Sequence, residues 1–176
     1  MFSPLPSDEA ARLDALRRYG SFGLLREAIF DDIARLAAYI CQTPISLISL
    51  VDSTHQWFLS CTGFDACETS RDVSFCAHAL VGTEMLVVED ALMDARFARN
   101  PLVTGDPHVR FYAGAPLLTS DGHALGTLCV IDHVPRQILT KQKELLQALS
   151  HLVMGQLDLN RVKRELSLLK GAHFKT

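Results

Sequence analysis

The sequence predicts an α+β fold, with helices at both ends of the chain and mostly antiparallel strands in the middle. Three observations lead to this prediction. Apolar residues recur at helical spacing over residues 29–40, short runs rich in Ile, Leu and Val occupy the middle, and a long helical pattern covers residues 141–170. Such an order of helices, strands and helix is typical of a layered α+β domain, and 176 residues suffice for one such domain.

Two helices are predicted before the strands. Residues 8–18 are charged and carry two leucines, so they form a short helix that stops at the break Gly20-Ser21-Phe22-Gly23. Residues 29–40 have apolar residues on one helical face and Asp31, Asp32 and Arg35 opposite, and Pro44 marks the end of this segment.

Five strands are predicted in the middle of the chain, over residues 45–51, 56–61, 86–89, 109–118 and 123–132. Asp121-Gly122 is a strong hairpin signal between the last two. Two long irregular stretches, 62–83 and 90–108, separate the strands, and long loops within a compact domain are commonly functional. Thr140 is expected to cap the last helix.

Composition excludes several classes of protein. The net charge of −3 does not suit binding to a phosphate backbone, so no nucleic-acid partner is expected. The N-terminus lacks the basic start and apolar run of a secretory signal, and no apolar stretch reaches membrane-spanning length. We therefore expect a cytoplasmic protein that does not bind a membrane. Its five cysteines lack Cys-x-x-Cys spacing, so we expect thiols and no metal site.

Several sequence blocks resemble those of a large bacterial subfamily of sensory GAF domains. They are Arg71 to Ala79 with its Ser-Phe-Cys-Ala-His-Ala core, Asp90-Ala91, Asp94-Ala95-Arg96-Phe97, Asn100-Pro101-Leu102-Val103, Arg110 to Leu117, Asp121-Gly122-His123, and Leu125 to Asp132. The blocks occur in the same order as in that subfamily, and the resemblance covers residues 12–157.

The resemblance implies a six-stranded antiparallel sheet with the N- and C-terminal helices on one face and a loop-roofed pocket on the other. Residues 1–157 would form the GAF domain, and residues 158–176 would extend its last helix. The subfamily often carries an Asp-Thr-Pro-type turn near residues 22–27, from which this sequence departs. Such domains usually precede histidine kinases or diguanylate cyclases. Since no such module follows here, we expect this chain to act alone or to signal to a separate kinase or cyclase.

The resemblance and the chemistry of the two irregular stretches nominate nine residues for binding a small molecule. We expect a cavity bordered by Phe75, His78, Asp90 and Tyr112. The full candidate set is Trp57, Asp72, Phe75, Cys76, His78, Asp90, Arg96, Phe111 and Tyr112. The ligand and any cofactor are unknown at this point.

Each candidate also has a structural interpretation. Cys76 and His78 resemble a metal or haem pair, but small core cysteines and hydrogen-bonded histidines are more common. Asp72 is interpreted as the partner of Arg71 in an ion pair or as a solvated residue. Arg96 suits a carboxylate or phosphate, or else a local partner such as Asp94, which fits a helix cap. The aromatic residues suit a pocket or the core.

Three functions remain open. The first is sensory or regulatory binding of a small molecule or partner without catalysis. The second is a thiol-dependent free methionine sulfoxide reductase, because such GAF-fold enzymes share the spacing of Cys67 and Cys76; however, residues 90–108, where that family carries its attacking cysteine, contain none. The third is a degenerate GAF domain that dimerises without a ligand.

Other chemistries lack their motifs. The signature of cyclic-nucleotide GAF domains is absent, Pro107-His108 occupies the place of the bilin-attaching Cys-His pair, and neither a Gly-x-x-x-x-Gly-Lys nor a Gly-x-Gly-x-x-Gly loop occurs.

The last helix carries two apolar stripes. One consists of Leu146, Leu149, Val153 and Leu157. The other repeats every seven residues at Leu145, Leu152, Leu159 and Leu166, with Ala148, Gly155, Val162 and Leu169 three residues later. This second stripe follows the a/d pattern of a coiled coil and predicts a parallel homodimer, while the first packs on the sheet.

Overall fold

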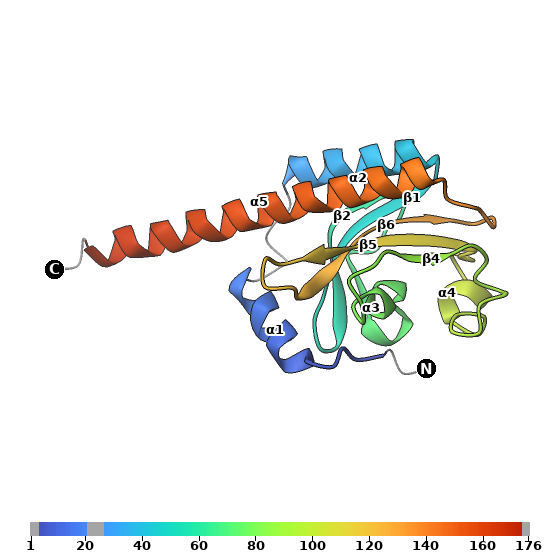
Figure 1. Ribbon diagram of the computed structural model, residues 1–176, viewed down its shortest axis with the longest axis horizontal. Helices are drawn as coiled ribbons and strands as arrows, with labels where there is room; N and C mark the ends of the chain where they lie inside the picture. Colours follow the sequence, from blue (N-terminus) through green and yellow to red (C-terminus); the bar gives the residue numbers. More distant parts are fainter. Residues whose placement is uncertain (1–3, 21–26, 174–176) are drawn as a thin grey trace.

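The computed structural model describes residues 4–20 and 27–173 of the chain. Its centre is a six-stranded antiparallel sheet of strand order β3-β2-β1-β6-β5-β4 (Figure 1). The strands are β1 (Ile45–Val51), β2 (His55–Thr62), β3 (Glu68–Ser70), β4 (Leu86–Val88), β5 (Phe111–Leu118) and β6 (Ala124–Asp132). The predicted α+β fold is confirmed.

Helices form a layer on each side of this sheet (Figure 1). The long ones, α2 (Ala28–Cys41) and α5 (Thr140–His173), lie side by side over one face. The short ones, α3 (Phe75–Ala79) and α4 (Pro101–Thr104), lie on the opposite side, and a 3-10 turn at Arg71–Val73 precedes α3. We call the two faces of the sheet the helix face and the pocket face.

The strands divide their side chains between two apolar cores because neighbours in a strand point to opposite faces. Ile48, Leu50 and Phe111 belong to the core under α2 and α5. Leu47 and Tyr112 belong to the core under α3 and α4. The central strands are buried on both faces, as their continuous apolar runs predict.

Helix α1 (Glu9–Arg18) crosses the end of the sheet where β1 ends and β6 begins. Its buried Arg12 donates Nη1 hydrogen bonds to the carbonyl oxygens of Val51 at 2.8 Å and Ala124 at 3.3 Å. Because these carbonyls lie at adjacent strand ends, one guanidinium ties together the helix and the two central strands.

Helix α5 runs past the sheet, and α1 contacts it there. The Tyr19 hydroxyl donates to Asp158 Oδ1 at 2.9 Å, and burial together with this carboxylate raises the pKa of Tyr19 to about 12. Arg164 donates Nη1 to the carbonyl oxygen of Tyr19 at 2.7 Å, and Asn160 donates to Glu27 Oε1 at 2.7 Å. The contacts between α5 and the rest of the domain therefore continue as far as residue 164.

The structure differs from the sequence-based expectations in a few places. Strand β3 and helices α3 and α4 lie in the stretches expected to be irregular, β5 begins at Phe111, and the last helix includes Thr140. The Asp121-Gly122 hairpin is present, with Gly122 at a φ of 86°. The expected departure near residues 22–27, apart from Glu27, and the Gly20–Gly23 break, apart from Gly20, lie outside the described residues. Over residues 4–20 and 27–173, no helix is long and apolar enough to cross a membrane.

Candidate functional site

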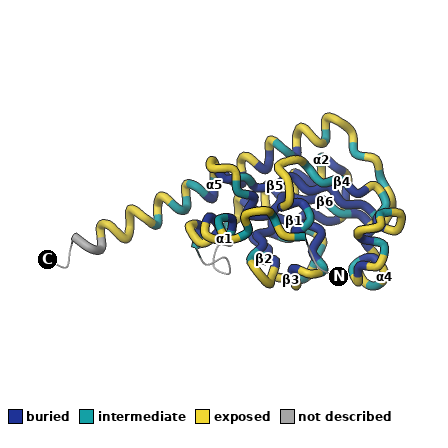
Figure 2. Tube along the Cα trace, turned by 60° about the horizontal axis from the view of Figure 1, so that its bottom comes forward, coloured by how far each residue is buried: buried dark blue, intermediate teal, exposed yellow. Residues whose placement is uncertain are grey.

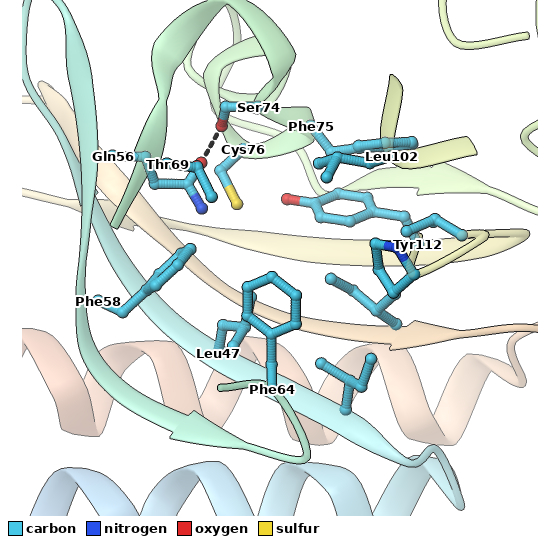
Figure 3. A pocket seen from close by; sticks show the side chains of 14 residues that line it. Leu47, Gln56, Phe58, Phe64, Thr69, Ser74, Phe75, Cys76, Leu102 and Tyr112 are labelled. Carbon is cyan, nitrogen blue, oxygen red and sulfur yellow. Dashed lines mark hydrogen bonds between the residues drawn. The ribbon is translucent and has the colours of Figure 1, made fainter. Parts of the chain in front are cut away.

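A small cavity lies on the pocket face, where we expected one. Its volume is about 30 Å³, which holds a molecule of the size of water and nothing much larger. Figure 3 shows side chains from the sheet, α3 and the loops converging on it. Most of the lining is apolar; the lining residues are Ile45, Leu47, Gln56, Phe58, Phe64, Thr69, Ser74, Phe75, Cys76, Leu102, Pro107, Val109, Tyr112 and Ile131.

Ser74 fixes the start of α3 above the cavity. Its Oγ accepts a hydrogen bond from the backbone N–H of Ala77 at 3.1 Å, as a helix N-cap does. The same hydroxyl donates to Oε1 of Gln56, a buried residue of β2 (Figure 3). These two hydrogen bonds anchor α3, which forms part of the roof of the cavity, to strand β2 of the sheet.

Two buried thiols meet beneath α3. The Sγ atoms of Cys76 in α3 and Cys129 in β6 are 3.8 Å apart, and both residues are almost inaccessible to solvent. Burial opposes ionisation of Cys76, but hydrogen bonds from Cys129, Ser49, Thr127 and Tyr112 outweigh burial and lower its pKa. The hydrogen bond with Cys76, and then burial, raise the pKa of Cys129, so Cys76 is the more acidic thiol.

Aromatic rings form the rest of the roof. Phe75 stacks on Phe97 at a centroid distance of 4.1 Å and lies 5.3 Å from the ring of Tyr112. The Tyr112 hydroxyl is 3.4 Å from Thr127 Oγ1, and burial is the first cause of its raised pKa. A Cβ atom at Gly114 would lie 2.2 Å from the Tyr112 hydroxyl oxygen, so glycine is required for the ring to lie along β5.

Three of the nine nominated residues, Phe75, Cys76 and Tyr112, line the cavity. Trp57 and Phe111 instead point to the other face of the sheet. Gln56 and Phe58 flank Trp57 and face the cavity, so strand alternation turns the indole away, and its Nε1 donates to Asp52 Oδ2 at 2.8 Å. Phe111 packs under α2 and α5 for the same reason, since its neighbour Tyr112 faces the cavity.

His78, which we expected to border the cavity, lies instead on the outer side of the roof. The half-buried ring of His78 meets that of Phe97 edge-on at 4.6 Å. Burial first, and then the positive charge of Arg96, lower the pKa of His78. Cys76 lines the cavity whereas His78 packs on Phe97, so the two do not converge on one point.

The remaining candidates have local partners. Asp90, expected at the cavity border, accepts the backbone N–H of Leu92. Asp94 accepts the backbone N–H of Arg96 and forms two hydrogen bonds with its guanidinium, so Asp94 acts as a local cap. Asp72 is exposed, and Arg71 pairs with Glu9 of α1 and not with Asp72.

Glu9 accepts hydrogen bonds from two buried arginines, Arg12 and Arg71. Burial raises the pKa of Glu9, but the hydrogen bonds and charges of both arginines outweigh it and hold the pKa below its ordinary value. The Nε and Nη2 atoms of Arg71 are buried and have no partner among the described residues. Across residues 4–20 and 27–173, no group of three or more His, Cys, Asp or Glu side chains is arranged to hold a metal ion.

Sequence reasoning missed most of the lining, including the polar residues Gln56 and Ser74, and it missed Cys129, whose thiol meets that of Cys76. Ser74 precedes Phe75 at the start of α3, where a serine is a common N-cap. Cys129 shares its strand face with Thr127 and Ile131 by alternation. That Cys129 meets Cys76, however, follows from the sheet topology, which no local signal reveals.

Comparisons with known proteins agree with this architecture. The family model described as GAF domain matches residues 25–157. The cyclic di-GMP phosphodiesterase PA2567 of Pseudomonas aeruginosa is 42% identical over 155 residues, which cover 88% of this chain but 26% of that protein. The chain thus spans about a quarter of the length of this relative.

Solved structures share the fold at low identity. The GAF domain of an Acinetobacter phosphoenolpyruvate-protein phosphotransferase has a TM-score of 0.64 at 14% identity, covering 92% of this chain and 99% of that one. The free methionine-R-sulfoxide reductase of Neisseria meningitidis has a TM-score of 0.63 at 16% identity, covering 93% of this chain and 97% of that one. On the match of the family model to most of its length, this chain belongs to the GAF domain family, a family of sensory and regulatory domains.

Proposed function

We propose that this GAF domain is a regulatory module that works as a parallel homodimer through α5 and passes the state of its pocket to a signalling enzyme. The observation that carries the proposal is the leucine stripe of α5 that the domain leaves uncovered. The other apolar stripe of α5 faces the sheet and is buried inside the domain.

The two stripes of α5 have different surroundings. Leu146, Leu149, Val153 and Leu157 are buried in the core of the helix face. Leu145, Leu152, Leu159 and Leu166 are exposed, and so are Val162 and Leu169 (Figure 2). Burying a leucine side chain stabilises by about 1.5–3 kcal/mol, so a seam of this length supplies enough free energy for association.

Small residues shape the seam near the domain. Ala148 and Gly155 are exposed at two of its positions, and nothing lies within 4 Å of a Cβ atom built at Gly155. Two helices can therefore approach closely beside the sheet.

The dimer is tested by light scattering after size-exclusion chromatography. We expect a dimer at tens of micromolar for the wild type and a monomer for Leu159→Glu/Leu166→Glu. The matched control is Leu168→Glu, because Leu168 is also exposed but lies roughly 180° around the helix from Leu159. A wild-type monomer, or a dimer that survives the double substitution, would contradict the proposal.

The cavity on the pocket face is the proposed site of ligand binding. At about 30 Å³ it is too small for a metabolite, so a small molecule would bind after α3 and α4 move outward. Its lining favours an apolar ligand that uses the few polar groups of Gln56, Ser74 and Tyr112. The competing function is a dimerisation module without a ligand.

Native mass spectrometry of protein purified from cells separates these two functions. A bound mass in the wild type that is lost in Leu102→Trp, which fills the cavity, supports ligand binding. Leu36→Trp, on the exposed side of α2, is the control and should keep the bound mass. A protein without any bound mass supports the dimerisation module.

The output partner would be a kinase, a cyclase or a phosphodiesterase. The name of the 42% identical relative supports a link to cyclic di-GMP turnover. A chimera of that protein in which this chain replaces the matching region tests the link. We expect cyclic di-GMP hydrolysis by the chimera, reduced by Leu159→Glu/Leu166→Glu and unchanged by Leu168→Glu. Equal hydrolysis by all three forms would contradict signalling through α5.

A further inference from the structure

The thiols of Cys76 and Cys129 lie close enough together to suggest redox chemistry, which the proposed regulatory function does not require. Cys76 belongs to the roof of the cavity and Cys129 to the centre of the sheet. Their sulfur atoms are 3.8 Å apart, close to van der Waals contact, and a disulfide requires about 2 Å. A disulfide would therefore need the two sulfur atoms to approach each other, by a shift of the short helix α3 toward β6 or by rotation of the two side chains.

The cavity gives a small oxidant a place beside one of these thiols. The Cys76 sulfur points into the space between Phe58, Phe64 and Tyr112 (Figure 3). A volume of about 30 Å³ admits a molecule of the size of water or hydrogen peroxide and excludes bulky reagents.

The surroundings favour the thiolate of Cys76 over that of its neighbour. Burial opposes ionisation of Cys76, but interactions with Cys129 and with the hydroxyl groups of Ser49, Thr127 and Tyr112 outweigh it and lower the pKa of Cys76. The hydrogen bond with Cys76, and then burial, raise the pKa of Cys129, so Cys129 suits the role of the resolving thiol.

We propose that Cys76 and Cys129 form a disulfide when hydrogen peroxide enters the cavity, which fastens the pocket roof to the sheet. The Cys76 thiolate attacks one peroxide oxygen, the O–O bond breaks, and hydroxide leaves with the thiol proton as water. The sulfur of Cys129 then attacks the resulting sulfenic acid, and its proton leaves with the hydroxyl group as a second water. Two thiols lose two electrons in total, and one peroxide is reduced to two waters.

A control thiol exists on the other face of the sheet. Cys41 is buried in the helix-face core, where burial raises its pKa to about 11. Cys41 also borders a pocket, of about 250 Å³, so it shares the burial of Cys76 and has access to a small oxidant. Its pKa is raised whereas that of Cys76 is lowered, so we expect Cys41 to react with peroxide more slowly than Cys76.

The experiment treats the folded chain of 176 residues with a modest excess of hydrogen peroxide, followed by alkylation under denaturing conditions and peptide mapping. We expect a linked peptide pair containing Cys76 and Cys129, a loss of two titratable thiols per chain, and reversal by dithiothreitol. The same link should form in Cys41→Ser/Cys61→Ser/Cys67→Ser, which leaves no other cysteine. N-ethylmaleimide, which is too bulky for the cavity, should label the exposed Cys67 of the native protein and spare Cys76.

The Cys129→Ser variant isolates the first step. Without the resolving thiol, Cys76 should accumulate as a sulfenic acid that dimedone traps. Failure to detect the linked pair in the wild type at peroxide concentrations that oxidise Cys67 would overturn the proposal. Oxidation of Cys41 at the same rate as Cys76 would overturn it as well, because a thiol beside any pocket would then react equally. Loss of the α5 dimer would leave this result unchanged, so the two proposals fail separately.

Discussion

At the residue scale, close packing around Tyr112 depends on the missing side chain of Gly114. Alanine at this position would place a Cβ atom 2.2 Å from the Tyr112 hydroxyl oxygen, so the ring must move within a closely packed core. Such overpacking typically costs about 1–3 kcal/mol. We expect Gly114→Ala to lower the free energy of unfolding by that amount in urea titrations. Gly82→Ala, at an exposed turn where the new Cβ meets no atom closer than 3.9 Å, is the control and should have little effect.

Glu9 makes stability depend on pH in a defined direction. Its pKa is lowered in the folded state, so its contribution is complete above the ordinary pKa of about 4.3 and is lost as the pH falls through the folded value. Glu9→Gln leaves Arg12 and Arg71 buried without a counter-charge, which typically costs about 3 kcal/mol. We expect this variant to be less stable at pH 7 and to lose less stability between pH 5 and 3.

The control for that measurement is Glu144→Gln. Glu144 pairs with Lys141 on the exposed side of α5, where a salt bridge contributes little. A pH profile of Glu9→Gln that parallels the wild type would contradict the role assigned to Glu9.

At the element scale, α3 is a five-residue helix whose position depends on Ser74. Ser74→Ala removes the N-cap bond to Ala77 and leaves the buried Oε1 of Gln56 without this donor. We expect a loss of about 1–3 kcal/mol and faster amide hydrogen exchange in residues 75–79. Ser70→Ala, which removes the exposed cap of the preceding 3-10 turn, should change exchange in α3 much less.

Sequence patterns predicted the long elements well and the short ones poorly. Strands β1, β5 and β6 are largely apolar runs, and Asp121-Gly122 identified the hairpin between β5 and β6. Strand β3 consists of Glu68, Thr69 and Ser70, three polar residues whose pairing with β2 arises from the tertiary fold. Local propensity carries no information about such a strand.

The candidate site was predicted only in part because aromatic character does not reveal which face of a strand a side chain occupies. Phe111 and Tyr112 are neighbours in one strand, so alternation allows just one of them to face the cavity. The same rule separates Trp57 from Phe58. Which of each pair faces the cavity depends on where α2, α3 and α5 pack, and this is settled by long-range contacts.

At the scale of the whole molecule, the end of the folded unit can be located by truncation. A chain that ends after Glu165 retains the contacts of Asp158, Asn160 and Arg164 with the N-terminal part of the domain. A chain that ends after Leu157 loses all three, at about 1 kcal/mol for each hydrogen bond. At dilutions where the protein is monomeric, we expect the longer form to melt like the wild type and the shorter form to melt several degrees lower. Equal melting temperatures would contradict the importance of these contacts.

Catalysis of methionine sulfoxide reduction is not expected from this site. Residues 90–108 contain no cysteine, and the cavity beside Cys76 is far smaller than an amino acid. With free methionine sulfoxide, thioredoxin and NADPH, we expect the same background rate for the wild type and Cys76→Ser. Turnover in the wild type that disappears in Cys76→Ser would assign the chain a reductase activity and overturn this expectation.

The edges of the sheet have a consequence for aggregation. Both outermost strands, β3 and β4, are three residues long. An edge strand that short presents few unpaired backbone groups to a strand from another molecule, so fibril-like stacking through the sheet is disfavoured. The protein therefore carries a long exposed leucine stripe on a helix without a matching hazard of open-ended growth along the edges of its sheet.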